Sequence, residues 1–195
     1  MKLLAPLSIP AIITIVVIVV VVLSLVIWMI ATYNSLVVSR NATDVASSDM
    51  DVYLKKRYDL IPNLVETVKG YAKHESEVLT AVTNARANAK AASTLEEKVA
   101  ADVEVTRALR SINLVAEKYP DLKADTSFLK LQSTLSSVEE DIANSRRYFN
   151  AKVGSYNAKI LKFPTNLLAN LFKFKSRPLY QVDDPEERKT VKVSF

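Results

Sequence analysis

The sequence predicts an all-α membrane protein, in which an amino-terminal transmembrane helix is followed by an up-and-down bundle of four long helices. Three observations support this fold class. No charged side chain occurs between Lys2 and Arg40, apolar residues further along recur at three- and four-residue steps, and Gly70 and Gly154 are the only glycines. So few glycines leave little room for turns of positive φ, which suits long helices joined by short connections.

The charge-free stretch contains an apolar run, Ala11–Ala31, that only Thr14 and Ser24 interrupt. At about 1.5 Å of rise per residue, a helix of this length extends roughly 30 Å, which is the thickness of a bilayer's hydrocarbon core. A secretory signal peptide has a shorter apolar region, of about 7–15 residues, followed by small residues at a cleavage site, and this run fits neither criterion. We therefore expect a retained single span over residues 11–32, after a short segment of residues 1–10.

The residues that flank the run indicate its orientation. Trp28 and Tyr33 lie where an interfacial belt of aromatic side chains is expected. Positive charge before the run is limited to Lys2 and the terminus, whereas Arg40 and residues 55–57 follow it. This bias favours a chain anchored in the cell membrane with its larger part on the cytoplasmic side.

The bundle is expected to occupy residues 33–162. Its first helix would continue from the span and end at a corner over Asp59–Pro62, and the second would run over residues 62–89. The corner is expected because a proline inside a helix removes a backbone hydrogen bond and costs about 3 kcal/mol. One kinked helix that passes through Pro62 is the alternative.

Two further helices complete the predicted bundle. Thr94 and Glu97 form a capping box that starts a helix ending before Pro120. Asp125 caps the start of the last helix, and Pro164 ends it because proline cannot continue the backbone ladder. The apolar stripe of this last helix comprises Phe128, Leu131, Leu135, Val138, Ile142, Phe149, Val153, Tyr156 and Ile160.

Residues 163–177 form a short apolar and basic segment after the bundle, and residues 178–195 form a tail. A fifth helix that covers the end of the bundle accounts for this segment, and the hypothesis beside it is a helix at the membrane interface, which its aromatic and basic side chains suit. Residues 191–195 alternate apolar and polar side chains, which is compatible with an edge strand or with an irregular tail. The candidate interface residues are Leu167, Leu171, Phe172, Lys173, Phe174 and Lys175.

The sequence contains little that catalysis could use. His74 is the single histidine and cysteine is absent, so no H-E-x-x-H zinc site, thiolate metal site or thiol nucleophile can form. The net charge of +5 is spread along the chain rather than clustered as nucleic-acid binding requires. We predict a protein that is not an enzyme, with no cofactor, no metal, no small-molecule substrate and no nucleic acid.

A set of polar residues recurs on the predicted helices, mostly as Tyr-Asn, Phe-Asn and Arg-Arg steps. Asparagine is a mediocre helix former, which suggests that these side chains bond between helices and fix the register of an otherwise apolar bundle. The functional alternative is that they form a docking face for a partner. The set comprises Tyr33, Asn34, Arg57, Asn63, Arg146, Arg147, Asn150, Tyr156 and Asn157.

Several of these residues fall in stretches that resemble the LemA protein family. The clearest is Lys55–Glu75, KKRYDLIPNLVETVKGYAKHE. Further matching stretches are Tyr33–Val37, Glu117–Ala124, Phe128–Gln132, Arg146–Asn150, Tyr156–Asn157, Phe163–Asn166 and Lys192–Phe195. The resemblance implies a membrane anchor and an up-and-down four-helix bundle in a bacterial or similar membrane. It implies no settled enzymatic activity, and one type of relative takes part in building magnetosome membranes.

We therefore predict a single-pass membrane protein that acts as a scaffold or adaptor through its helical bundle. The alternative is a signalling or sensing module that transmits a conformational change along the span and the helix continuous with it. The expected partners are the lipid bilayer and other membrane proteins, and self-association is left open.

Overall fold

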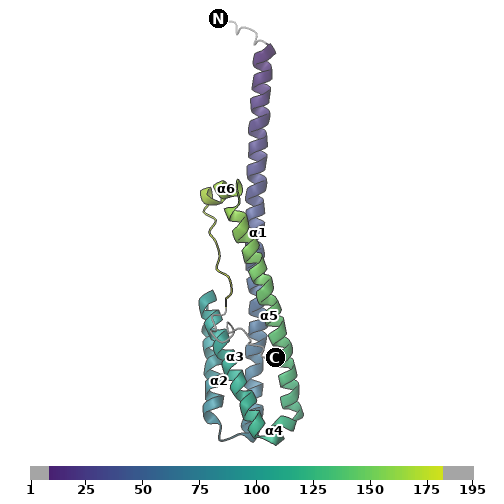
Figure 1. Cartoon of the computed structure of the whole chain (residues 1–195), viewed down its shortest axis with the longest axis vertical. Helices are drawn as coiled ribbons and strands as arrows, with labels where there is room; N and C mark the ends of the chain where they lie inside the picture. Colours follow the sequence, from purple (N-terminus) through teal and green to yellow (C-terminus); the bar gives the residue numbers. More distant parts are fainter. Residues whose placement is uncertain (1–8, 182–195) are drawn as a thin grey trace, which may run out of the picture. The chain divides into compact units, whose positions relative to one another are not determined.

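The computed structural model describes residues 9–181, and this part of the chain is built from helices without a strand (Figure 1). The predicted all-α class is confirmed. The tail predictions for residues 191–195 lie outside the described residues. The helices are α1 (Ile9–Tyr71), α2 (Ser76–Ala91), α3 (Leu95–Lys118), α4 (Pro120–Ala124), α5 (Thr126–Leu161) and α6 (Thr165–Leu171).

The chain divides into two compact units. Among the described residues, the anchor unit comprises residues 9–44 and 152–177, and the bundle unit comprises residues 45–151 and 178–181. Helices α1 and α5 each contribute residues to both units, whereas α2, α3 and α4 belong to the bundle unit and α6 to the anchor unit.

The predicted corner at Asp59–Pro62 is wrong, because α1 continues through Pro62 and ends at Tyr71. A proline at this position deprives the carbonyl of Tyr58, four residues earlier, of its helical donor. Arg86 of α2 replaces that donor, with its Nε 2.9 Å from the Tyr58 oxygen. The chain turns instead after Tyr71, in the short link before α2 begins at Ser76.

The start and stop signals in the second half of the chain work as the sequence predicts. The Thr94 hydroxyl accepts a hydrogen bond from the Glu97 amide at 3.2 Å, and the Glu97 carboxylate accepts one from the Thr94 amide at 3.0 Å. Asp125 accepts a hydrogen bond from the Phe128 amide at 2.8 Å at the start of α5. Pro120 ends the helix before it and opens α4, since its missing N–H is not needed in a first turn.

The core follows the predicted apolar stripes. In the bundle unit, α5 buries Phe128, Leu135, Val138, Ile142 and Phe149. Hydrogen bonds and ion pairs between side chains join the helices around this core. They include Lys98–Asp51, Lys56–Asp141, Asn88–Glu104, Gln132–Asn113 and Tyr71–Asp125.

The anchor unit has a small core of its own, in which Leu36, Tyr156, Ile160 and Ala169 are buried together and Phe174 packs against them. The Lys159 ammonium strengthens this contact. It donates to Ser35 Oγ at 2.6 Å and to Ser39 Oγ at 2.8 Å. Apolar contacts therefore hold the α1, α5 and α6 parts of the unit together, and polar contacts also join α5 to α1.

Within residues 9–181, α1 is the helix that is long and apolar enough to cross a membrane. None of the residues in its apolar window is buried inside the protein. A core helix of a soluble protein would be covered by its own chain, so this exposed apolar surface favours contact with lipid.

Candidate functional site

The most concentrated polar arrangement in the bundle unit surrounds Asp102 of α3, which is 1% exposed. Its Oδ1 accepts a hydrogen bond from Arg57 Nη2 of α1, and its Oδ2 accepts one from Arg146 Nη2 of α5. The Tyr180 hydroxyl, from the segment after α6, donates to the same Oδ2 at 2.9 Å. One carboxylate thereby joins two long helices and the C-terminal segment to α3.

Arg57 is also fully buried and extends the cluster towards the surface. Its Nη1 donates to Glu139 Oε1 at 2.8 Å and to Thr106 Oγ1 at 3.3 Å. Among the described residues, no hydrogen-bond acceptor reaches its Nε. The two guanidinium groups are balanced by the carboxylates of Asp102 and Glu139, so the cluster carries little net charge. We call these residues (Arg57, Asp102, Thr106, Glu139, Arg146, Tyr180) the Asp102 cluster.

Aromatic rings lie against the two guanidinium groups of the cluster. The Arg146 guanidinium lies 5.0 Å from the centre of the Tyr180 ring, a cation–π contact, and the Arg57 guanidinium lies 5.7 Å from that of Tyr58. Burial raises the pKa of Tyr180 above its ordinary value of 10.0, and the positive charge of Arg146 offsets part of that rise. Tyr180 is therefore a neutral hydrogen-bond donor to Asp102 throughout the physiological range.

Buried ion pairs of this kind add little net stability to a fold, but the fold is strongly destabilised when either partner is removed. Taking charges out of water is costly, and removing one partner leaves another charge uncompensated, at about 3–5 kcal/mol. The arrangement therefore selects one register of α1, α3 and α5 and one placement of the C-terminal segment. This is a positioning role.

The sequence identifies part of this cluster and misses the rest. Arg57, Arg146 and Asn150 belong to the predicted polar set, and the structure brings all three to this region of the bundle unit. The Asn150 amide pairs with the backbone of Tyr180, at 2.9 Å to its oxygen and 2.8 Å from its nitrogen. Asp102 was missed, although its place on the buried face of α3, one turn before Val105, is a detectable signal.

The other predicted polar residues are distributed differently. In the anchor unit, the Tyr156 hydroxyl donates to the Lys175 carbonyl at 3.0 Å, and the Asn157 amide pairs with both backbone groups of Arg177. The Tyr33 ring contacts aromatic rings of the segment after α6. The remaining members, Asn34, Asn63 and Arg147, are exposed.

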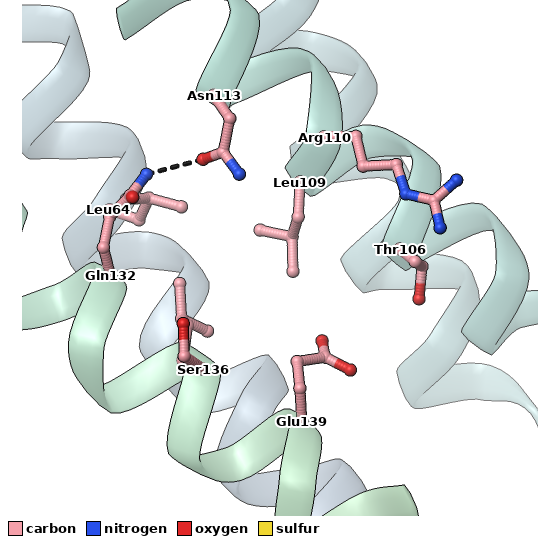
Figure 2. Close-up of a pocket in the computed structure, with 9 residues that line it drawn as sticks. Leu64, Thr106, Leu109, Arg110, Asn113, Gln132, Ser136 and Glu139 are labelled. Carbon is pink, nitrogen blue, oxygen red and sulfur yellow. Dashed lines mark hydrogen bonds between the residues drawn. The ribbon is translucent and has the colours of Figure 1, made fainter. Parts of the chain in front are cut away.

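A pocket of about 270 Å³ opens beside Glu139 in the bundle unit (Figure 2). Leu109 lies between the α3 and α5 walls, and the Glu139 carboxylate reaches towards the Thr106 side of the opening. Arg110, Gln132 and Ser136 complete a mixed polar rim.

The single histidine and the acidic side chains form no further site in the described part of the chain. His74 is exposed in the link between α1 and α2. Across residues 9–181, no group of three or more histidine, aspartate or glutamate side chains is placed to hold a metal ion.

The chain is similar in sequence to one protein family and to several known proteins. Residues 46–195 match the LemA family. The chain is 28% identical over 157 residues to Protein LemA of Metamycoplasma hominis, covering 78% of this chain and 70% of that protein. It is 25% identical over 179 residues to Magnetosome protein MamQ 2 of Paramagnetospirillum magneticum, covering 78% and 66% respectively. For Magnetosome protein MamQ of Magnetospirillum gryphiswaldense the identity is 23% over 173 residues, covering 75% and 64%.

The chain thus spans slightly less than two thirds of the length of the magnetosome proteins it matches. The family match covers the whole described part of the bundle unit except Val45, and it includes every residue of the Asp102 cluster. With its helical fold and its apolar amino-terminal helix, this chain is a membrane-associated protein that belongs to the LemA family.

Proposed function

We propose that this protein is a non-enzymatic, single-pass scaffold or adaptor, whose bundle unit presents a lateral surface to other membrane proteins. One observation carries the proposal: α1 contains the apolar run and also supplies residues to the bundle unit, with no break between Ile9 and Tyr71. A span that continues into the bundle unit as one helix ties that unit directly to the membrane anchor.

The Asp102 cluster supports a scaffold because it fixes the shape of the surface that a partner would meet. Binding to a preformed surface avoids the entropy cost of ordering side chains and loops at the moment of association. The names of the magnetosome relatives, MamQ, support a role connected with a cellular membrane structure.

A groove of about 690 Å³ along α3 is the surface that we assign to the partner. Leu95, Val99 and Val103 line it at successive four-residue steps, and Leu179 of the C-terminal segment forms the opposite wall. An apolar row with this spacing accepts the apolar face of a helix, and Glu104 and Arg107 offer polar contacts at its rim.

Photo-crosslinking in intact cells tests this assignment. A photoreactive amino acid replaces Val103 in the groove, and in the control it replaces Leu129, which is 51% exposed on α5. We expect discrete crosslinked products that contain another membrane protein from position 103 and none from position 129. Crosslinking that is absent from both positions, or equal at both, contradicts a scaffold that uses this groove.

The cytoplasmic placement of the bundle unit is part of the proposal. Arg40 follows the apolar run, and the anchor unit adds exposed cations at Lys162, Lys173 and Lys175. This positive charge on the carboxyl side of the run favours the cytoplasmic face. A reporter fused after Phe195 that is active only in the cytoplasm is expected to be active, and an inactive reporter contradicts the placement.

The unbroken α1 also favours a second candidate, a signalling module in which α1 transmits rotation from the span. Because a helix has 3.6 residues per turn, inserting two residues between Ala31 and Thr32 rotates the span by about 200°, whereas seven residues restore its phase to within about 20°. A signalling module loses its output with two residues and regains it with seven. A scaffold keeps the position-103 crosslink with both.

A further inference from the structure

Helix α6 and its flanking residues expose a group of large apolar side chains. Leu161 is 73% exposed, Phe163 is 74% exposed and Leu171 is 66% exposed. Leu167, one helical turn before Leu171, is also exposed, as is Phe172. Adjacent apolar side chains on a folded surface mark a site of contact with protein or with lipid.

This exposed surface is held rigidly by the opposite side of the same helix. Leu168 and Ala169 are 5% and 1% exposed, and Ala169 packs in the anchor-unit core with Leu36 and Ile160. A small rotation of α6 could not bury the exposed leucines, because it would pull Leu168 and Ala169 out of the core. They are a second apolar face, additional to the one the fold needs.

Ring contacts place the segment at the level where the apolar run of α1 ends. The Tyr33 ring lies 4.8 Å from the Phe172 ring and 5.9 Å from the Phe174 ring, centre to centre. Tyr33 is two residues beyond Ala31, which corresponds to about 3 Å along the helix axis. The headgroup zone on each side of a bilayer is about 5–8 Å thick, so Phe172 lies at its depth if Ala31 marks the hydrocarbon edge.

The charges of the segment match an anionic headgroup layer. Lys162, Lys173 and Lys175 are exposed, and within residues 161–175 there is no acidic side chain. Lys173 adopts a φ of 58°, a left-handed conformation that glycine reaches without the Cβ penalty. The backbone thus holds a cation between Phe172 and Phe174 at a position where a neutral glycine would be less strained.

We propose that residues 161–175, which we call the interface collar, insert their apolar side chains into the headgroup–acyl boundary of the bilayer that α1 spans. A short helix with leucine and phenylalanine on one side and lysines around them binds lipid in this way. The collar would clamp α1 at a fixed depth and add a second contact between the anchor unit and the membrane. A lipid surface is favoured over a protein partner because the collar is continuous with the exposed apolar run through Tyr33.

The test uses the full chain in nanodiscs and the absence of native cysteine. Leu171→Cys and, as an independent second site, Leu167→Cys are each labelled with a nitroxide. Val20→Cys in the apolar run reports whether α1 is embedded, and Leu129→Cys in the bundle unit reports exposure to water. The collision rates of the label with oxygen and with a water-soluble nickel complex are measured in phosphatidylcholine, with and without phosphatidylglycerol.

We expect the labels at positions 171 and 167 to collide with oxygen several-fold more often, relative to nickel, than the label at position 129. Phosphatidylglycerol should increase that ratio, and Lys162→Gln/Lys173→Gln/Lys175→Gln should abolish the increase. Nickel access equal to that at position 129, while position 20 is embedded, overturns the proposal. Low access to both reagents also overturns it, because it indicates cover by protein or by a second copy. Neither result depends on the partner groove along α3.

Discussion

Arg86 Nε lies 2.9 Å from the carbonyl oxygen of Tyr58 and replaces the helical hydrogen bond that Pro62 cannot donate. These residues are on different helices, α2 and α1, so the repair of the proline defect also joins the two helices. The lost helical hydrogen bond is thereby turned into a tertiary contact.

This pairing predicts a coupled response to substitution. Arg86→Met should destabilise the folded protein by about 1–3 kcal/mol, because it leaves the Tyr58 carbonyl without a donor. Pro62→Ala restores a backbone N–H, so it should stabilise the Arg86→Met protein more than it stabilises the parent protein. Denaturant unfolding of the detergent-solubilised full chain measures both differences. Arg110→Met on the exposed side of α3 is the control, and an equal gain from Pro62→Ala in both backgrounds would refute the pairing.

The Asp102 cluster predicts that removing the single carboxylate of Asp102 strongly destabilises the bundle unit. Asp102→Ala should destabilise the bundle unit by about 3–5 kcal/mol, because it leaves the Arg57 and Arg146 guanidinium groups buried without their shared acceptor. Asp49→Ala removes the same charge from an exposed position of α1 and should change stability by less than about 0.5 kcal/mol. Thermal unfolding followed by circular dichroism measures both. Similar effects for the two variants would mean that the cluster does not hold the bundle unit together.

The capping role of Glu97 predicts that the stability of the folded protein depends on pH. Hydrogen bonds from the Thr94 and Ser93 amides lower its pKa from 4.5 to about 2. Because the pKa is lower in the folded state, the ionised cap contributes fully to the free energy of unfolding above pH 4.5. That contribution is lost as the pH falls towards 2. The loss of stability between pH 7 and pH 3 should therefore be smaller for Glu97→Gln than for the parent protein. Glu96→Gln, which removes an adjacent charge without removing the cap, should leave that loss unchanged.

The left-handed backbone of Lys173 predicts that glycine at this position stabilises the turn at the end of α6. The Phe174 amide bonds to the Ala169 carbonyl at 2.9 Å across this left-handed residue, as in the usual glycine-terminated helix end. Lys173→Gly removes a Cβ penalty of about 1–2 kcal/mol, which the greater freedom of glycine in the unfolded chain partly offsets. Slower hydrogen exchange of the Phe174 amide is the expected result. Lys175→Gly should give no such protection, and faster exchange in Lys173→Gly would contradict the account.

Local features were predictable from the sequence and distant pairings were not. The caps at Thr94 and Asp125 act within three or four residues, and the α5 stripe follows from helical periodicity alone. Pro62 was misread because the donor that compensates for it, Arg86, lies 28 positions from Tyr58. The same reason applies to the candidate site, since Asp102 and Tyr180 are 78 positions apart and neither identifies the other before the chain is folded.

We propose that α1 holds this LemA-family protein in a bilayer while its bundle unit binds another membrane protein. The most direct test is photo-crosslinking from position 103 in intact cells, followed by isolation of the membranes and an alkaline wash. We predict that the chain and its crosslinked partner remain together in the washed membrane pellet. Recovery of the chain in the wash, without a crosslinked partner, would contradict the claim.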